Sequence, residues 1–337
     1  FLSEQFAETV AKQLTLNDIN VMLAVKPCPT PAISLAVKNF KLDGAVMITA
    51  SHNPALFNGF KIKANFAGSA PPEITQQVEM ELTAAEKVIQ TRPLPATATC
   101  YTLIQPFDPL PDYLKRLTEL VNLETLTHFP IDIYVDPMFG SGAGLLTHLL
   151  QSKGIQTQEI HQNRDPLFGG VNPEPIEKNL EGLKQLIQNR ESKKKPCIGI
   201  VLDGDADRVG ALGNYGQFIT PHQVFLILLY HLHTHRRLSG GVAKATNISS
   251  MVDRLALHFR LPLWETPIGF KYICDLMLQQ DILLGGEESG GFGIKGHIPE
   301  RDGPLCGLLL LEDFAQSRMS IEDLLETEGG LRLLSIV

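Results

Sequence analysis

Residues 198–208 read Ile198-Gly199-Ile200-Val201-Leu202-Asp203-Gly204-Asp205-Ala206-Asp207-Arg208, so an apolar run ends in three aspartates at alternate positions. The five apolar residues are typical of a short buried strand, which places the carboxylates in a tight turn at its carboxyl end. Carboxylates this close repel one another and become protonated or separate unless a cation neutralises them. Hard oxygen ligands favour a divalent metal ion, and Mg²⁺ is the first interpretation.

Two other interpretations of the aspartate triplet are a solvated acidic turn hinged at Gly204 and a calcium loop of the EF-hand kind. The EF-hand loop requires glycine where Arg208 stands and a bidentate glutamate where Asn214 stands. It also lies between helices, whereas this triplet follows a predicted strand. Calcium is therefore disfavoured, and the solvated turn stays open on this motif alone.

The composition argues against several classes of protein. The chain has 337 residues, enough for two or three domains, and 44% of them are hydrophobic, as in an ordinary α/β protein. A net charge of -8, without a basic patch that contains aromatic residues, argues against nucleic acid as a partner. The longest apolar run, residues 224–230, is too short to cross a bilayer, so no membrane is expected as a partner. The five cysteines lack metal-binding spacing and are expected as reduced thiols in a cytoplasmic protein.

Strands and helices alternate along the chain in three units. The first unit is expected over residues 1–105 and to be incomplete at its N-terminus, because Phe1 already belongs to an apolar helical stripe. Its expected elements are strands at residues 19–25, 44–49 and 61–63 and a helix at residues 72–90. The expected linker is formed by the Pro- and Thr-rich residues 91–99 together with Pro106, Pro109 and Pro111.

The second and third units are expected over residues 106–216 and 217–337. In the second unit we expect a helix near Tyr113 and strands at residues 131–135 and 155–160. We also expect a glycine-rich turn at residues 136–144, followed by a helix to residue 153, and a helix at residues 176–190. Expected in the third are strands at 241–246 and 282–284, the latter leading into residues 285–291. The predicted fold class is three consecutive α/β domains, each a mixed sheet layered between helices. Because each unit has its most unusual turn after a strand, an active-site cleft is predicted at the domain junction.

A serine turn follows the predicted strand at residues 44–49. Ser51 stands in a turn stiffened by Asn53-Pro54, although most serines in such turns only satisfy the backbone. No G-x-S-x-G elbow is present, which disfavours an acyl-transfer hydrolase. A serine close to three aspartates and a metal suits phosphoryl transfer. Lys61 could reach the same pocket and act as an acid or base, since a nearby cation lowers its affinity for a proton; a solvated strand residue is the alternative.

A glutamate turn at residues 285–291 places Glu287, Glu288 and Ser289 between glycines. Carboxylates in such a turn can accept hydrogen bonds from the vicinal hydroxyls of a sugar, and a flexible acidic loop is the alternative. Downstream, Arg301 offers a fork-shaped donor that suits phosphate. Lys271 is a further positively charged candidate for binding the substrate. The alternative is that it caps a helix.

Five motifs in order resemble those of the α-D-phosphohexomutase family, the phosphoglucomutases and phosphomannomutases. They are Thr49-Ala50-Ser51-His52-Asn53-Pro54, the aspartate loop at residues 203–208, residues 266–271, Gly286-Glu287-Glu288-Ser289 and Arg301-Asp302-Gly303. The resemblance extends over essentially the whole chain. It departs at Arg301, where the family often has lysine.

The resemblance implies that the protein interconverts glucose 1-phosphate and glucose 6-phosphate. A phosphorylated Ser51 is then expected to donate its phosphoryl group to the substrate, giving glucose 1,6-bisphosphate, which reorients and returns the other phosphoryl group. The implied catalytic residues are Ser51, Lys61 and His52, and the implied Mg²⁺ ligands are Ser51, Asp203, Asp205 and Asp207. The implied substrate-binding residues are Glu287, Ser289, Arg208, Thr266, Gly269, Lys271 and Arg301.

The resemblance leaves more than one phosphosugar as the substrate. Glu288 argues against a glucosamine phosphate, because those relatives tend to carry glutamine there. A phosphomannomutase or another phosphosugar mutase is the alternative. From other classes, a non-catalytic sugar-phosphate-binding relative and a metal-dependent phosphatase stay open. The sequence predicts no oligomeric state.

Two segments of the family pattern have no match in this sequence. The family starts with a Gly-Ile/Leu-Arg-Gly segment that carries a catalytic arginine, and no such segment precedes Phe1. It ends with a fourth domain whose Arg-x-Ser-Gly-Thr loop holds the substrate phosphate, and no such loop precedes Val337. The chain is therefore expected to be a fragment that binds metal but turns over substrate poorly.

Overall fold

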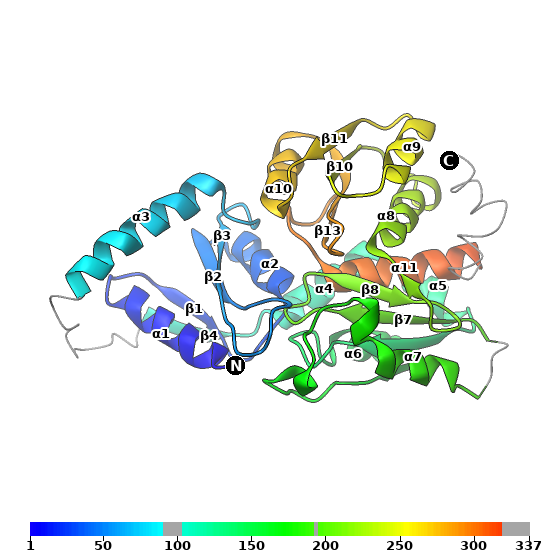
Figure 1. The fold of residues 1–337 in the computed structure, drawn as a ribbon, viewed down its shortest axis with the longest axis horizontal. Coiled ribbons are helices and arrows are strands. Elements are labelled where there is room, and N and C mark those ends of the chain that lie inside the picture. The colour runs from blue at the N-terminus through cyan, green and yellow to red at the C-terminus, as the bar shows by residue number, and fades with distance from the viewer. Residues whose placement is uncertain (90–102, 192–194, 319–337) are drawn as a thin grey trace.

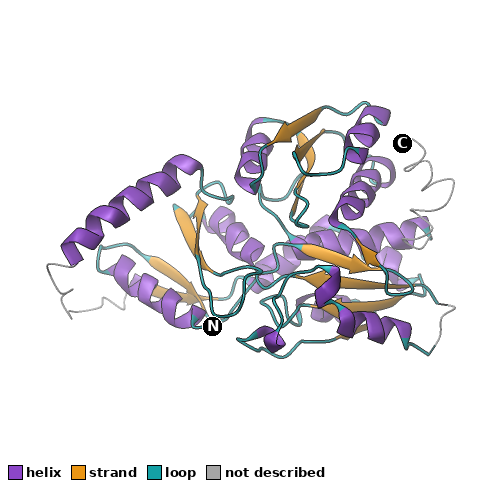
Figure 2. Cartoon of the chain, viewed as in Figure 1, coloured by secondary structure: helices purple, strands orange, loops and turns teal. Residues whose placement is uncertain are grey.

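The computed structural model describes residues 1–89, 103–191 and 195–318, which form three α/β lobes (Figure 1). In each lobe helices flank short strands, so the expected fold class of three α/β domains with mixed sheets between helices is confirmed (Figure 2). No helix in the described ranges combines the length and the apolar composition that crossing a membrane requires.

In the first lobe the strands form two separate pairs. Its elements are α1 (Ser3–Thr15), β1 (Val21–Ala24), α2 (Thr30–Phe40), β2 (Gly44–Ile48), β3 (Phe60–Ala64), α3 (Pro72–Ile89) and β4 (Ile104–Phe107). Strand β2 is antiparallel to β3, with Ile48 opposite Phe60, and β1 is parallel to β4. The loop that connects β2 to β3 therefore begins and ends at the same end of this strand pair, the end that faces the other two lobes (Figure 1).

One part of the predicted linker is wrong. Pro106 belongs to β4, which returns to the first lobe and pairs with β1. A proline is tolerated there because β4 has a partner on one side only, so the missing N–H removes no ladder bond. Residues 91–99 lie outside the described ranges. Pro109 and Pro111 stand at the start of the next helix, where proline is favoured.

The second lobe is built on a five-stranded sheet. Its elements are α4 (Leu110–Leu120), α5 (Glu124–Thr127), β5 (Asp132–Asp136), α6 (Leu145–Ser152), β6 (Thr157–Glu159), α7 (Glu181–Gln188), β7 (Cys197–Leu202), β8 (Val209–Leu212) and β9 (Phe218–Ile219). The strand order is β6-β5-β7-β8-β9, and β8 and β9 run antiparallel to their neighbours. All of β7 is buried, which explains its continuous apolar sequence. The aspartates follow it directly, as predicted.

The third lobe has a four-stranded sheet in the order β11-β10-β12-β13. Its elements are α8 (Pro221–Tyr230), a π-helical segment η4 (His231–His235), β10 (Gly241–Ala245), α9 (Met251–His258), β11 (Leu263–Thr266), α10 (Phe270–Gln279), β12 (Ile282–Gly286), β13 (Phe292–Ile294) and α11 (Gly303–Ser317). Helix α8 starts at a capping box, in which Thr220 and Gln223 satisfy each other's backbone N–H. The glutamate turn joins β12 to the antiparallel β13.

Helix α11 joins the second and third lobes. It packs against α8 and η4 on one side and against β7, β8 and α5 on the other (Figure 1). Asp302 caps its N-terminus and accepts a hydrogen bond from the buried Tyr113 hydroxyl of α4 at 2.7 Å. The two lobes consequently share one apolar core, which runs through α11.

A buried ion pair joins the first lobe to the third. Lys63 Nζ of β3 lies 2.5 Å from Glu300 Oε2, and the two side chains are 1% and 0% exposed. The Ser69 hydroxyl donates to the same carboxylate at 3.0 Å. Burial of a lone carboxylate is costly, so this contact depends on both partners being present.

We expect Lys63→Met to lower the free energy of unfolding by about 3 kcal/mol, because it leaves the Glu300 carboxylate buried without its nearest cation. Urea denaturation followed by circular dichroism measures the change. Lys12→Met is the matched control: Lys12 lies 3.7 Å from Glu8 on the exposed surface of α1, where such a pair contributes less than about 1 kcal/mol. Equal destabilisation by the two substitutions would contradict the role given to the buried pair.

Candidate functional site

The serine loop between β2 and β3 points the Ser51 hydroxyl at the second lobe. Thr49 N donates to Gly59 O at 3.0 Å and closes the base of the loop. Ser51 has a left-handed backbone (φ 55°), and its N–H donates to Thr49 Oγ1 at 2.8 Å. This conformation is uncommon outside glycine, so the surrounding contacts must hold it. In this conformation Ser51 Oγ donates a hydrogen bond to Asp203 Oδ2 at 2.9 Å.

The aspartate loop packs directly against the backbone of the serine loop. A Cβ on Gly204 would lie 2.4 Å from the Ser51 carbonyl oxygen and 3.0 Å from the Pro173 ring. On its other side, Ser141 N donates to Gly204 O at 2.9 Å. Only glycine fits between these neighbours, so Gly204 permits the contact between the first and second lobes.

The three aspartates are buried together with cationic side chains from all three lobes. Asp203, Asp205 and Asp207 are at most 2% exposed. Lys61 Nζ of β3 lies 2.7 Å from Asp205 Oδ2 and 3.0 Å from Asp207 Oδ2. From the third lobe, Arg301 lies 2.6 Å from Asp207 Oδ2. Protein cations therefore neutralise part of the charge of the triplet, so burial of the three carboxylates does not by itself require a metal ion.

The carboxylates of the triplet differ in pKa because their neighbours differ. Burial and the charges of Asp205 and Asp207 raise the pKa of Asp203 well above its usual range. Burial acts in the same direction on Asp207, but Arg301 and Lys61 outweigh it and lower the pKa of that carboxyl. Of the three, Asp203 is therefore the carboxyl that most readily holds a proton.

The neighbouring carboxylates determine the protonation state of Lys61. Burial favours the neutral amine, but the charges of Asp205 and Asp207 outweigh it and raise the pKa of Lys61. In this state Lys61 is a charged ion-pair partner. It can give up its proton near neutral pH only when other cations take over the carboxylate charge.

The donor set nevertheless fits a divalent cation. The three aspartates each offer an oxygen, and these atoms all lie within 4.8 Å of one another. Two buried oxygens, Asp205 Oδ1 and Asp207 Oδ1, accept no hydrogen bond from the described residues. Carboxylate and hydroxyl oxygens are the ligands that Mg²⁺ prefers. The aspartates, with Ser51 beside Asp203, could therefore hold a magnesium ion.

Thr30 is a site residue that the sequence analysis missed. Its hydroxyl donates to Asp205 Oδ2 at 2.8 Å, and its N–H donates to the Asp205 carbonyl oxygen at 2.9 Å. It stands at the start of α2, after the proline-rich turn that follows β1. A threonine between two prolines at the carboxyl end of a strand was the signal that could have revealed it.

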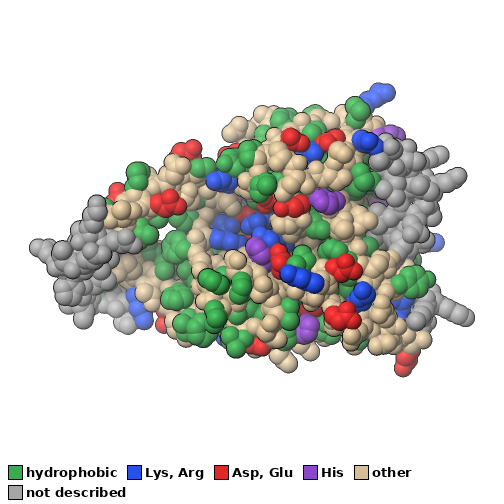
Figure 3. All heavy atoms as spheres, viewed as in Figure 1, with side chains coloured by type: hydrophobic (Ala, Val, Ile, Leu, Met, Phe, Trp, Pro, Cys, Tyr) green, Lys and Arg blue, Asp and Glu red, His purple; other side chains and the backbone are tan. Residues whose placement is uncertain are grey.

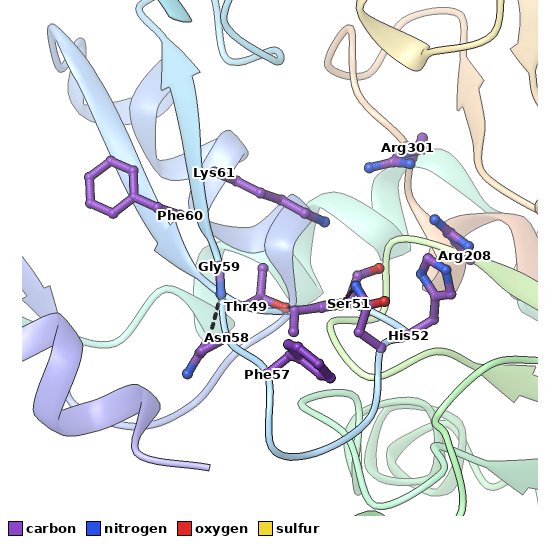
Figure 4. Close-up of a pocket in the computed structure, with 12 residues that line it drawn as sticks. Thr49, Ser51, His52, Phe57, Asn58, Gly59, Phe60, Lys61, Arg208 and Arg301 are labelled. Atoms are coloured by element: carbon purple, nitrogen blue, oxygen red, sulfur yellow. Dashed lines mark hydrogen bonds between the residues drawn. The ribbon is translucent and has the colours of Figure 1, made fainter. Parts of the chain in front are cut away.

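A cleft of about 500 Å³ lies between the serine loop and the side chains of Arg208 and Arg301 (Figure 4). Figure 3 shows Lys and Arg side chains gathered in the hollow at the centre of this face. The predicted site residues in its lining are Ser51, His52, Lys61, Arg208 and Arg301. The lining also contains residues that were not predicted: Thr49, Ala50, Asn53, Phe57, Asn58, Gly59 and Phe60.

His52 and Arg208 lie beside each other at the mouth of the cleft (Figure 4). Burial and the Arg208 charge lower the pKa of His52, so its ring is neutral at pH 7. Its Nε2 lies 3.9 Å from Glu174 Oε1. Arg208 donates its backbone N–H to Asp203 Oδ1 at 3.1 Å, and its guanidinium Nε lies 3.9 Å from both Asp203 and Asp207.

The glutamate turn lies beside the cleft and is tied to the second lobe. Glu287 Oε1 accepts from Gly269 N at 2.9 Å, and Glu287 Oε2 lies 3.6 Å from Arg301. Burial raises the pKa of Glu287, despite the opposing charge of Arg301. Val209 of β8 donates to Gly290 O at 2.9 Å, which fixes the turn against the aspartate loop. The structure thus brings Gly269, Glu287 and Arg301 together.

Like Gly269 and Glu287, the remaining predicted substrate-binding residues do not line the cleft. Thr266 is buried and its hydroxyl donates to Pro267 O at 3.1 Å. Lys271 lies 5.2 Å from the centre of the Tyr272 ring, on the first turn of α10. Ser289 is half-buried at the tip of the glutamate turn. These three side chains therefore belong to the third lobe and are not part of the cleft lining.

Comparisons with known proteins match all three lobes to one family. The models of α/β/α domains I, II and III of phosphoglucomutase/phosphomannomutase match residues 1–88, 111–216 and 220–328. These matches follow one another along the chain in the family's own order.

Individual relatives differ in the substrates that their names give. A solved structure from Thermus thermophilus, provisionally described as a phosphomannomutase, is 35% identical with a TM-score of 0.86, and the match covers 100% of this chain and 73% of that one. Phosphoglucomutase of Schizosaccharomyces pombe is 30% identical over 89% of this chain and 57% of its own length. Phosphoglucosamine mutase of Salinispora arenicola is 29% identical over 95% of this chain and 69% of its own length. The chain thus spans 57% and 69% of the length of these two curated relatives.

We expect Asp205→Asn to weaken Mg²⁺ binding at least about tenfold, which is about 1.4 kcal/mol, because it removes one charged oxygen ligand. Isothermal titration with MgCl₂ at constant pH measures the dissociation constant. Glu174→Gln is the control, since it neutralises a carboxylate near His52, outside the triplet. If both variants bind Mg²⁺ like the unmodified chain, the metal does not bind at the aspartates.

Proposed function

The chain belongs to the phosphoglucomutase/phosphomannomutase family, and we propose that its protein moves a phosphoryl group between two positions of a hexose phosphate through Ser51. The observation that supports this best is the hydrogen bond of Ser51 Oγ to Asp203 at 2.9 Å, at the mouth of the aspartate site. It places a nucleophilic hydroxyl where cationic side chains can neutralise a phosphoryl group. Because the chain spans only part of its relatives, the proposed activity is that of the whole protein.

In the proposed reaction, phosphorylated Ser51 gives its phosphoryl group to the free hydroxyl of a hexose 1-phosphate. The P–O bond to Ser51 breaks, a P–O bond to the sugar oxygen forms, and the hydroxyl proton passes to a base on the protein. After the 1,6-bisphosphate has turned round, its other phosphoryl group returns to Ser51 and the leaving sugar oxygen takes up a proton. Mg²⁺ bound by Ser51, Asp203, Asp205 and Asp207 would supply positive charge for the transferred group.

We assign the proton transfer to Lys61 and His52. His52 lines the cleft, and its lowered pKa keeps its ring neutral and able to accept a proton. Lys61 also lines the cleft, and its ammonium can donate to a sugar oxygen. For Lys61 to act as the base, its two carboxylate partners must first be neutralised, since they raise its pKa.

We assign substrate binding to both sides of the cleft. Arg208 and Arg301 would hold the phosphate that is not being transferred, since guanidinium groups form paired hydrogen bonds with phosphate. Glu287 would accept hydrogen bonds from sugar hydroxyls, and Ser289 would donate a hydrogen bond to one. Because Thr266, Gly269 and Lys271 lie on the third lobe, their assignment requires that this lobe contacts the substrate as it turns.

We propose glucose phosphate as the substrate, with mannose phosphate as the alternative. Glu288 supports a neutral sugar over glucosamine, as the resemblance to the glucose-preferring loop implies. We also propose a cytoplasmic location. The described cysteines, Cys28, Cys197, Cys274 and Cys306, are buried and form no disulfide with one another, which fits a reducing compartment.

Ser51→Ala tests the phosphoserine. After incubation with glucose 1,6-bisphosphate, intact-mass measurement should find one added phosphoryl group on the unmodified protein and none on the variant. Ser141→Ala is the matched control, because this serine lies against Gly204 but its buried hydroxyl has no partner among the described residues. A phosphoryl group on the Ser51 variant, or none on the unmodified protein, would refute the proposed mechanism. Continuous release of inorganic phosphate would instead identify a phosphatase.

A second measurement tests the sugar separately from the mechanism. We expect kcat/KM for glucose 1-phosphate to exceed that for mannose 1-phosphate at least about tenfold, because a hydrogen bond between a hydroxyl and a charged carboxylate contributes about 1.5–3 kcal/mol. Initial rates with each 1-phosphate and a catalytic amount of the matching 1,6-bisphosphate give the ratio. A similar preference for mannose or glucosamine 1-phosphate would overturn the glucose assignment and leave the role of Ser51 intact.

A further inference from the structure

Two histidines and an aspartate meet outside the cleft, where η4 contacts α11. Segment η4 continues α8, which lies against α11 in Figure 1. His231 Nδ1 lies 3.1 Å from Asp313 Oδ1, and His235 Nδ1 lies 2.9 Å from the same oxygen. The two Nδ1 atoms are 3.4 Å apart. His231 and Asp313 are 0% and 1% exposed, whereas the His235 side chain is 24% exposed and reaches the surface.

The backbone of η4 brings the two rings together. His231 and His235 are four residues apart, so one helical turn places both on the face that packs against α11. The segment is π-helical, an arrangement that is rare and often found at functional sites. Asp313 comes from the C-terminal half of α11, 82 residues after His231 in the chain.

The spacing of these three atoms matches the ligands of a small transition-metal ion. A tetrahedral zinc ion with bonds of roughly 2.0–2.1 Å to nitrogen and oxygen separates its ligands by roughly 3.3 Å. The observed separations are 2.9, 3.1 and 3.4 Å. Imidazole nitrogens select zinc and its neighbours over magnesium or calcium.

Hydrogen bonds alone leave this cluster poorly satisfied. Both Nδ1 atoms compete for one oxygen of Asp313, and the buried His231 Nε2 has no hydrogen-bond partner among the described residues. That Nε2 lies 3.6 Å from Glu312 Oε1. When Nδ1 of a histidine binds a metal, its Nε2 carries the hydrogen and commonly faces a carboxylate, which is the position that Glu312 occupies.

We propose that His231 Nδ1, His235 Nδ1 and Asp313 Oδ1 bind one divalent transition-metal ion, best matched by Zn²⁺, with water at the remaining position. The ion fastens the end of α8 and η4 to α11. Because α11 also packs on β7 and β8, it stabilises the junction of the second and third lobes without taking part in the chemistry of the cleft.

The rival occupant of the cluster is a proton. Burial of His231 opposes its charge, but the neighbouring carboxylates of Asp313 and Glu312 outweigh burial and raise the pKa of the ring. A protonated His231 would bridge the two carboxylates without a metal. The test must therefore count bound zinc and not only measure stability.

The test compares the unmodified chain with His235→Ala and His233→Ala. His233 is the matched control, because it lies on the same segment but packs on the Phe259 ring, 4.3 Å away, outside the cluster. Each protein is equilibrated with Zn²⁺ in excess Mg²⁺ and its bound zinc is counted by atomic emission. Zinc at the aspartate triplet is common to all three proteins and cancels in the comparison.

We expect one more zinc ion on the unmodified chain and on His233→Ala than on His235→Ala, and an affinity at least about tenfold lower in the last. Zn²⁺ should raise the melting temperature only where the extra ion is bound. Equal zinc on all three proteins, or equal loss from both variants, overturns the proposal. If His235→Ala does not fold, as judged by circular dichroism, His235→Gln replaces it. Stabilisation on acidification without bound zinc identifies the proton as the occupant and also overturns the proposal.

Discussion

The structure depends on the neutralisation of three carboxylates buried in a single loop. Taking one such charge out of water is costly, and Asp203, Asp205 and Asp207 stand within five residues. The compensating charges come from elsewhere: Lys61 from the first lobe, Arg301 from the third, and Arg208 from the end of the loop itself. The electrostatic requirement of one loop therefore determines where all three lobes meet.

Buried polar contacts hold the lobes around this loop. Tyr113 and His297 donate to the two oxygens of Asp302, at 2.7 and 3.0 Å, where α11 begins. Glu300, which precedes Arg301 in the chain, pairs with Lys63 and so links β3 to the same region. The cleft thus rests on a polar framework whose members lose their partners if the lobes separate, which limits how far it can open.

The cations of the cleft have two tasks in the proposed reaction. In the present state Lys61 and Arg301 are paired with carboxylates, which raises the pKa of both side chains against the effect of burial. A phosphorylated substrate would compete for the same positive charge, and a bound metal would release it from the aspartates. Changes in charge at the aspartates are thereby coupled to the protonation of Lys61 and to the phosphate affinity of Arg301.

The sequence by itself determined the local features: the buried strand before the aspartates, the serine and glutamate turns, and the alternation that indicates three α/β lobes. Those features follow from short-range periodicity and turn chemistry. Only the tertiary structure placed Thr30 on Asp205, paired Lys63 with Glu300, returned Pro106 to the first lobe and joined His231 to Asp313. Each of these contacts links residues far apart in the chain, where no local pattern specifies the partner. The charge state of Lys61 was likewise decided by folding, because burial and neighbouring carboxylates act through space and not along the sequence.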